Sequence, residues 1–394
     1  MKKEYLIKQY KTIYKKSPTY IIRAPGRINL IGGHTDYNDG FVLPIAIDKY
    51  TNMLVSKNNE KKIRLYDLKY KESNEFDLDN IELSPQKKWS NYQRGIAKAL
   101  LDAEYEIGGM DVLILSEVPE GAGLSSSASI EIATLLSFKK LSDLEIKPIE
   151  MIKLARKAEN EFVGVDCGIM DQFASLLSKE NHALFIDCRT LNFQYIHLSI
   201  QGYSFLVCNS MVKRKLAESS YNKRRRECRD ALKILQKYLP EIKALRDISF
   251  DDLERYGSFL PGKLQKRVKH VVYENERVIQ SYRELLQENI ERFGGFMYRS
   301  HQSLKELYEV STEELDLLVE IGKNETGVLG ARLTGAGFGG CVIYLVKNSC
   351  IEKLKEKILD VYGKKTDLVP QFYKVVPSRG AYVYSTESGF PHYY

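Results

Sequence analysis

The chain has 394 residues, of which 43% are hydrophobic and 28% are charged, and its formal net charge is +7. This length exceeds that of one ordinary domain and predicts two, and the composition is that of a globular protein able to bury a sizeable core. Positive and negative charges are mixed along the whole chain, which argues against a nucleic-acid-binding protein and suits an anionic ligand such as a nucleotide.

Six widely spaced cysteines form no C-x-x-C pair, so the sequence predicts neither a structural zinc site nor a disulfide framework. The N-terminus begins as polar helical sequence without the apolar region of a signal peptide. No apolar run approaches the roughly 18 residues of a membrane span. We expect a cytoplasmic protein with no membrane or nucleic-acid partner, present as a monomer or weak homo-oligomer.

Hydrophobic periodicity predicts strands and helices in irregular succession. After a region of strands and turns at 19–56, the predicted strands lie at 111–118, 182–187, 204–210, 330–334, 341–346 and 373–376. The predicted helices lie at 91–103, 124–140, 147–161, 168–178, 214–238, 262–290, 311–323 and 350–362. Because regular βαβ alternation is absent, the pattern predicts an α+β fold with a domain boundary near residue 200.

The segment PEGAGLSSSAS, residues 119–129, joins a predicted strand to a predicted helix. Gly121 and Gly123 allow a tight turn and the close approach of a ligand. Ser125 to Ser129 begin the helix with free N–H groups, the positive end of the helix dipole and several hydroxyls, a combination suited to a triphosphate. The segment is neither a G-x-x-x-x-G-K-[ST] loop nor a G-x-G-x-x-G motif. A plain strand-to-helix turn capped by serines is the alternative interpretation.

A second glycine-rich segment, LTGAGFGG at 333–340, lies between two predicted strands. By itself it is compatible with a hairpin loop. Two such loops, one in each predicted domain, would be well placed to close over one ligand from opposite sides.

The N-terminal segment RAPGRINLIGGHTDY, residues 23–37, sets Arg27, Asn29, His34 and Asp36 among apolar residues. Buried polar groups are costly unless they are satisfied, so this cluster indicates a hydrogen-bonded network or a ligand site. Taken singly, His34 could be a satisfied core histidine and Asp36 a turn residue.

A third cluster, GIMDQF at 168–173, places Asp171 in the first turn of a predicted helix. Such an acid often only complements the helix dipole. Glu159, twelve residues upstream on the preceding helix, could equally belong to a solvated face.

Several segments resemble the signature segments of galactokinases, within the GHMP small-molecule kinase superfamily. They are GRINLIGGHTDYNDGFVLPIAI, VPEGAGLSSSAS, CGIMDQF and LTGAGFGGC, and the likeness continues through Asn209–Ser210, SSYNKRRREC at 219–228 and SHQSLKELYEVSTEELD at 300–316. The resemblance covers nearly the whole chain in order. It implies a two-domain α+β GHMP kinase fold, with domains at 1–200 and 201–394 and the active site between them.

The resemblance also implies roles for individual residues. Asp171 and Arg27 would flank the anomeric hydroxyl, Asp171 accepting its proton or orienting it and Arg27 steadying the developing charge. Ser127 and Glu159 would hold Mg²⁺. The sugar site would comprise Gly33, His34, Asp36, Asp171 and Tyr221. The ATP site would comprise Gly121, Ala122, Gly123, Leu124, Ser125, Ser126, Ser127, Ala128, Ser129, Gly335 and Gly337.

The chain departs at Gly33 from the galactokinases that it resembles. Galactokinases carry a glutamate at this position, and that glutamate is expected to bind the sugar's 6-hydroxyl. Without that acceptor the site has less reason to prefer a 6-hydroxyl. D-Galacturonate, D-galactose and L-arabinose remain compatible substrates. We rank galacturonate slightly ahead, because the family's glutamate would repel its carboxylate and Gly33 would not. The basic run Lys213–Lys215 could meet such a carboxylate, or it could be a solvated helix start. N-Acetylgalactosamine fits less well, since kinases for it keep the glutamate.

Two other classes remain open. A sugar sensor built on the galactokinase fold is disfavoured because the serine segment, Asp171 and Glu159 are all present. A kinase for a non-sugar alcohol such as mevalonate or homoserine is disfavoured because HTDY and CGIMDQF resemble the sugar branch. The expected activity is therefore an ATP-dependent sugar 1-kinase.

Overall fold

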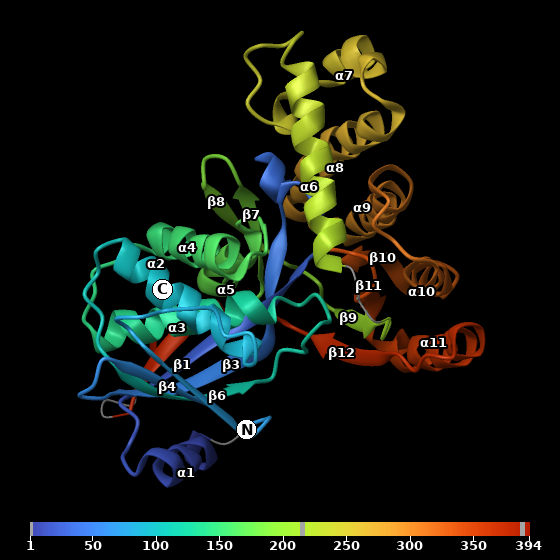
Figure 1. The fold of residues 1–394 in the computed structure, drawn as a ribbon. Coiled ribbons are helices and arrows are strands. Elements are labelled where there is room, and N and C mark those ends of the chain that lie inside the picture. The colour runs from blue at the N-terminus through green and yellow to red at the C-terminus, as the bar shows by residue number, and fades with distance from the viewer. Residues whose placement is uncertain (1–2, 213–216, 387–390) are drawn as a thin grey trace.

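The computed structural model describes residues 3–212, 217–386 and 391–394. The basic run Lys213–Lys215, considered above as a partner for a sugar carboxylate, lies outside the described residues. Helices and strands form two halves that lie side by side, each built on its own sheet (Figure 1).

The first half is built on an eight-stranded sheet with the order β15-β14-β1-β3-β6-β4-β5, and β13 pairs with β3 at the side. All described pairs are antiparallel except β4 with β6. The strands are β1 (Tyr20–Asn29), β3 (Pro44–Lys57), β4 (Lys62–Asp67), β5 (Glu72–Asp77), β6 (Met110–Ser116), β13 (Pro377–Ser378), β14 (Tyr382–Ser385) and β15 (Pro391–Tyr393).

Helices cover both faces of this sheet (Figure 1). One face carries α2 (Asn91–Asp102), α3 (Ser126–Leu141), α4 (Pro148–Lys157) and α5 (Met170–Leu177), and the other carries α1 (Lys3–Tyr14). Strand alternation explains both contacts: Ile22 and Val55 belong to the core under the four helices, whereas Ile21 and Leu54 pack with α1.

A small sheet of β2 (Phe41–Val42), β7 (His182–Asp187) and β8 (Phe193–His197) lies beside the first. Short 3₁₀ or π-helical turns complete the described chain at Asp36–Asn38, Lys88–Ser90, Ala158–Val163, Leu245–Asp247, Gly257–Phe259, Leu304–Tyr308 and Asn348–Cys350.

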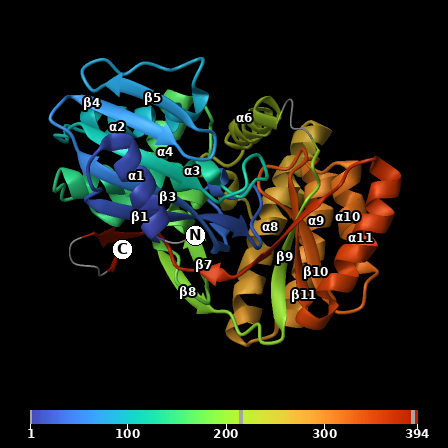
Figure 2. The same ribbon diagram turned by 90° about the horizontal axis from the view of Figure 1, so that it is seen from below.

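The second half is built on the antiparallel sheet β10-β11-β9-β12, with the helices packed around it (Figure 2). Its strands are β9 (Tyr203–Asn209), β10 (Val328–Thr334), β11 (Cys341–Lys347) and β12 (Gln371–Val375). Its helices are α6 (Ala217–Leu235), α7 (Phe250–Tyr256), α8 (Gly262–Leu286), α9 (Ile290–Ser303), α10 (Glu313–Lys323) and α11 (Ile351–Thr366).

The two halves share a core. One face of the second sheet, including Phe205, Val207 and Ile343, packs in one cluster with Ile28 and Leu43 of the first half. This shared apolar core holds β1 next to β10, which is the condition for a pocket lined by both halves.

The predicted α+β fold is confirmed, and most predicted elements appear within a few residues of their expected ends. The sequence pattern did not predict β4, β5, β8, α7 or α9, nor the strands after residue 376. The proposed division near residue 200 falls between β8 and β9. Because β14 pairs with β1, we assign the described residues 377–386 and 391–394 to the first unit of the proposed division.

In the described part of the chain, no helix is both long and apolar enough to cross a membrane.

Candidate active site

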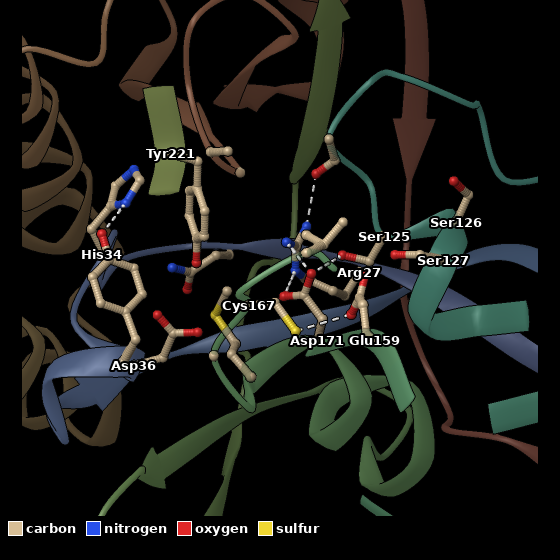
Figure 3. A pocket seen from close by; sticks show the side chains of 18 of the residues that line it. Arg27, His34, Asp36, Ser125, Ser126, Ser127, Glu159, Cys167, Asp171 and Tyr221 are labelled. Carbon is tan, nitrogen blue, oxygen red and sulfur yellow. Dashed lines mark hydrogen bonds and ion pairs between the residues drawn. The ribbon is translucent and has the colours of Figure 1, made fainter. Parts of the chain in front are cut away.

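A cavity of about 290 Å³ opens between the two halves. Its wall is drawn mainly from the first half, and Tyr221, Gly335 and Ala336 of the second half close it. Figure 3 shows polar side chains from several elements converging on this space. The predicted residues Arg27, Gly33, His34, Asp36, Glu159 and Asp171 all line it.

Asp171 is held by three hydrogen bonds at the start of α5. Arg27 donates from Nε to Oδ1 and from Nη2 to Oδ2, both at 2.7 Å, and Ser125 Oγ donates to Oδ2 at 2.6 Å (Figure 3). The Asp171 side chain keeps 24% exposure, so the carboxylate still faces the cavity. A carboxylate gripped by a bidentate guanidinium has a defined orientation toward a ligand.

Local backbone geometry aims Arg27. The pairing of β1 with β3 changes register between Pro25 and Arg27, and such a bulge redirects the following side chain. Arg27 Nη1 also donates to the Gly123 carbonyl at 2.7 Å, which ties the strand to the glycine–serine segment.

The glycine–serine segment forms the turn from β6 into α3. Gly121, Gly123 and Ser125 have φ of 67°, 78° and 60°, and Ser125 accepts this strained region without being a glycine. The cavity is lined by Gly121, Gly123, Ser125, Ser126 and Ser127.

The remaining residues predicted for the ATP site face the core. Ala122, Leu124, Ala128 and Ser129 are buried, and Ser129 Oγ pairs with Thr51 Oγ1 at 2.6 Å. Any contact they make with ATP would therefore go through the backbone, and their role stays a prediction.

The two glycine-rich segments lie against each other. Gly335 has φ of 81°, and a Cβ added there would lie 3.0 Å from the Gly123 carbonyl oxygen. Gly335 lines the cavity. Gly337 packs instead on Val310, whose carbonyl oxygen would lie 2.3 Å from a Cβ at that position.

Glu159 is buried on the π-helical turn after α4, not on a solvated face. Its Oε2 accepts from Gln172 Nε2 at 2.7 Å and from Cys167 Sγ at 3.0 Å. Burial raises the pKa of Glu159, and the Ser127 hydroxyl is among the hydrogen-bond donors that act against this. A hydroxyl and a carboxylate facing one cavity are the hard oxygen donors that fit Mg²⁺ bound to a nucleotide.

His34, Asp36 and Tyr221 lie together at the other end of the cavity (Figure 3). His34 has a φ of 64°, a strained value for a residue with a side chain, and its Nδ1 lies 2.7 Å from the Tyr37 hydroxyl. Burial lowers the pKa of His34 to about 3, so the ring is neutral. A Cβ on Gly168 would lie 1.8 Å from Asp36 Oδ2, so only glycine at 168 leaves room for that carboxylate.

The sequence analysis missed several contacts of the candidate residues. It placed Ser125 with ATP but not against Asp171, and it did not connect Cys167, Gln172 and Glu131 with Glu159. It also overlooked Arg332, which lies behind Gly33. An arginine inside the apolar strand pattern VLGARLT was the available signal for Arg332.

Three family models match the chain. The galactokinase galactose-binding signature matches residues 8–57, the GHMP kinase N-terminal domain matches 91–179 and the GHMP kinase C-terminal domain matches 281–364.

Curated relatives and solved structures agree. The chain is 43% identical over 357 residues to a galactokinase of Chloroflexus aggregans, covering 91% of each chain, and 41% identical over 375 residues to one of Fusobacterium nucleatum, covering 94% of this chain and 96% of that one. A crystal structure of Lactococcus lactis galactokinase complexed with galactose superposes with a TM-score of 0.92 at 36% identity, covering 96% of this chain and 98% of that one. A Methanococcus jannaschii mevalonate kinase, at 24% identity and a TM-score of 0.63, shares the fold. The chain belongs to the galactokinase family of sugar kinases.

Proposed function

We propose that this chain transfers the γ-phosphate of ATP to the anomeric hydroxyl of a galactose-configured sugar, D-galacturonate or D-galactose. The observation that carries the proposal is the Asp171 carboxylate, oriented by Arg27 and Ser125 and open to the same cavity as Ser126, Ser127 and Glu159. The partners are a sugar and ATP, bound by a protein that acts as a monomer or weak homo-oligomer.

Different residues have different roles in phosphoryl transfer. Asp171 accepts the proton of the anomeric hydroxyl as its oxygen attacks the γ-phosphorus and the bond to the β-phosphate oxygen breaks, releasing ADP. Arg27 holds the carboxylate and stabilises negative charge on the attacking oxygen. The N–H groups at the start of α3 and the hydroxyls of Ser126 and Ser127 bind the phosphates.

Mg²⁺ fits the oxygens of Ser127 and Glu159, and when bound it supplies positive charge that neutralises the phosphates. The burial that raises the pKa of Glu159 also makes an ionised Glu159 costly without a cation. Glu159 therefore contributes a carboxylate whose charge is most favourable when nucleotide and metal are present.

The sugar binds at the opposite end, between His34, Asp36 and Tyr221. Neutral His34 and the Asp36 carboxylate can hydrogen-bond ring hydroxyls, and the Tyr221 ring, 5.7 Å from that of His34, gives an apolar wall. L-Arabinose also fits a site without a side chain at position 33. A non-catalytic sensor fits less well, because its site would not need Glu159 and Ser127 beside Asp171.

The first test is ADP release by the purified chain with galacturonate, galactose, arabinose or N-acetylgalactosamine. We expect turnover that depends on sugar and on Mg²⁺, with phosphate on the anomeric oxygen. Sugar binding without ADP release from any of the four would contradict the proposal and support the sensor.

The second test replaces Asp171. Asp171→Asn keeps the shape but cannot accept a proton, so kcat is expected to fall by about 10²–10⁴-fold while sugar still binds. Asp102→Asn, at the exposed end of α2, is the matched control and should keep full activity. Circular dichroism confirms folding, and near-wild-type kcat in Asp171→Asn would remove Asp171 from this role.

A further inference from the structure

Gly33 lines the cavity, and the space where its side chain would begin is filled by an arginine. A Cβ added to Gly33 would lie 2.7 Å from Arg332 Nη2, closer than side-chain atoms tolerate. Behind Gly33, the guanidinium of Arg332 and the Leu304 side chain, whose Cδ2 would lie 3.2 Å from that Cβ, take the volume that a side chain at position 33 would otherwise occupy.

Arg332 is 1% exposed and incompletely paired. Nη1 donates to the Asn29 carbonyl at 3.1 Å, whereas Nε has no hydrogen-bond partner among the described residues. In that part of the chain Arg332 also forms no ion pair. A buried guanidinium that lacks hydrogen-bond and charge partners costs free energy unless a ligand supplies them.

Positive charge exceeds negative charge around Arg332. Glu274 attracts it at longer range, but Glu274 already pairs with Arg277 at 2.7 Å and accepts from the Gly32 and Gly33 amides and Ser300. Two guanidinium groups thus share one carboxylate.

Among the described residues, Glu274 is the acidic group that acts most strongly on Arg332. Burial lowers the pKa values of His34 and His270 to about 3 and about 4, so both rings are neutral. The charges that act most strongly on the Asp36 carboxyl are those of Asp171, Arg225 and Arg156. The corner of the cavity at Gly33 therefore carries an unbalanced positive charge.

We propose that Arg332 is the specificity-determining residue of this pocket and binds a carboxylate on the exocyclic carbon of a galactose-configured sugar, so that the preferred acceptor is the uronic acid. The inference rests on the proposed function, since it assumes that the sugar occupies this cavity. A carboxylate supplies the two acceptor oxygens and the negative charge that a guanidinium pairs with, and a 6-hydroxyl supplies neither the charge nor the second oxygen.

The test compares kcat/KM for galacturonate and galactose, together with Kd for each sugar from calorimetry without nucleotide. The wild type is expected to prefer galacturonate in both measurements. Turnover of neither sugar would overturn the proposed function itself. Preference for galactose in both measurements would overturn this inference and leave the kinase assignment standing.

Gly33 lies outside the left-handed region, so a side chain there does not strain the backbone, but the end of the flexible Arg332 side chain has to shift to admit it. Gly33→Glu should pair with Arg332 and repel a sugar carboxylate, lowering kcat/KM for galacturonate by at least about 100-fold relative to galactose. Gly33→Gln has nearly the same shape without the charge and should cost galacturonate less. Gly295→Glu, on α9 with open space around its Cβ, is the matched control and should leave the ratio unchanged.

Arg332→Met removes the charge while keeping an unbranched side chain, and Arg332→Lys keeps the charge without the planar fork. We expect galacturonate to lose at least about 100-fold in Arg332→Met and less in Arg332→Lys, with galactose changed by less than about tenfold. If Arg332→Met does not fold, the Gly33→Glu and Gly33→Gln variants test the inference. An unchanged sugar ratio in Gly33→Glu, or in folded Arg332→Met, overturns the inference.

Discussion

At the scale of single residues, the end of the cavity at Gly33 and His34 depends on two buried histidines, His34 and His270, held neutral. His270 Nε2 lies 2.9 Å from the Gly33 carbonyl oxygen and its Nδ1 lies 2.8 Å from Ser303 Oγ, which fits a ring that donates from Nε2 and accepts at Nδ1. His34 meets the Tyr37 hydroxyl, which in turn lies 2.7 Å from the Tyr308 hydroxyl. Protonating either ring would place a charge among these groups and beside Arg332.

These histidines predict loss of stability in acid. Their folded pKa values, about 3 for His34 and about 4 for His270, lie below the ordinary value of 6.5, so the unfolded chain takes up protons that the folded chain refuses. The stability they contribute is fully present above about pH 6.5 and is lost as the pH falls toward the folded values. Urea unfolding at a series of pH values measures this loss.

His270→Gln tests the assignment, because glutamine keeps a donor for the Gly33 carbonyl and cannot titrate. Its free energy of unfolding should fall less steeply between about pH 6.5 and about pH 5 than that of the wild type. The difference in slope corresponds to at most one fewer proton taken up on unfolding. His182→Gln, at a half-buried site of β7, is the control. An identical slope in His270→Gln and the wild type would show that His270 is not held neutral.

At the scale of secondary-structure elements, α3, α5 and the π-helical turn meet at a buried acidic cluster behind the serines. Gln172 Nε2 of α5 donates to Glu131 Oε2 of α3 at 3.0 Å as well as to Glu159. Glu131 is 0% exposed and its Oε1 has no partner among the described residues. Burial, followed by the charge of Glu159, raises the pKa of Glu131 well above the ordinary value.

Replacing Glu131 by glutamine should stabilise the protein at alkaline pH. A carboxyl whose folded pKa is raised favours folding below its unfolded pKa, and that contribution is lost as the pH rises through the folded pKa. Glu131→Gln removes the titration, so we expect its free energy of unfolding at about pH 8 to exceed that of the wild type by on the order of 1 kcal/mol. Chemical denaturation measures this difference, and Glu145→Gln, an exposed change, should show none.

At the scale of the whole molecule, the chain leaves the first half at β9 and returns to it at β13 and β14. Val383 of β14 is 0% exposed and packs in the core with Ile22, its partner in register on β1. Ion pairs also cross between the halves, with Arg189 of the first bonded to Asp247 of the second at 2.6 Å. The first sheet is therefore complete only when the end of the chain is in place.

This arrangement predicts unequal effects for one substitution at two positions near the C-terminus. Val383→Asp buries an unpaired charge and should destabilise the protein by several kcal/mol, lowering Tm by more than about 5 °C. Val369→Asp, where the side chain is 74% exposed, should change stability by less than about 0.5 kcal/mol. Equal Tm values for the two variants would mean that β14 contributes little to the first sheet.

Local sequence predicted much of the fold and named most residues of the candidate site. Alternating and helical hydrophobic patterns predicted the α+β class, and the Gly121–Ser129 and Gly168–Phe173 segments pointed to a phosphate-binding turn and an acidic residue. These signals are readable because they arise between residues a few positions apart, whose spacing follows from the geometry of a helix or strand. The return of β14 to β1 left no such signal, because strand pairing over that distance depends on the packed core.

Contacts between distant residues required the folded chain. Arg27 and Asp171 are 144 residues apart, and nothing in either neighbourhood encodes their bidentate pair or the Ser125 hydroxyl beside it. Gly33 was visible in the sequence as a missing side chain, but the guanidinium that fills its place comes from β10, and only the packing of β10 against β1 brings the two together. Long-range pairing depends on which apolar surfaces are buried together, a property of the whole core and not of any single segment.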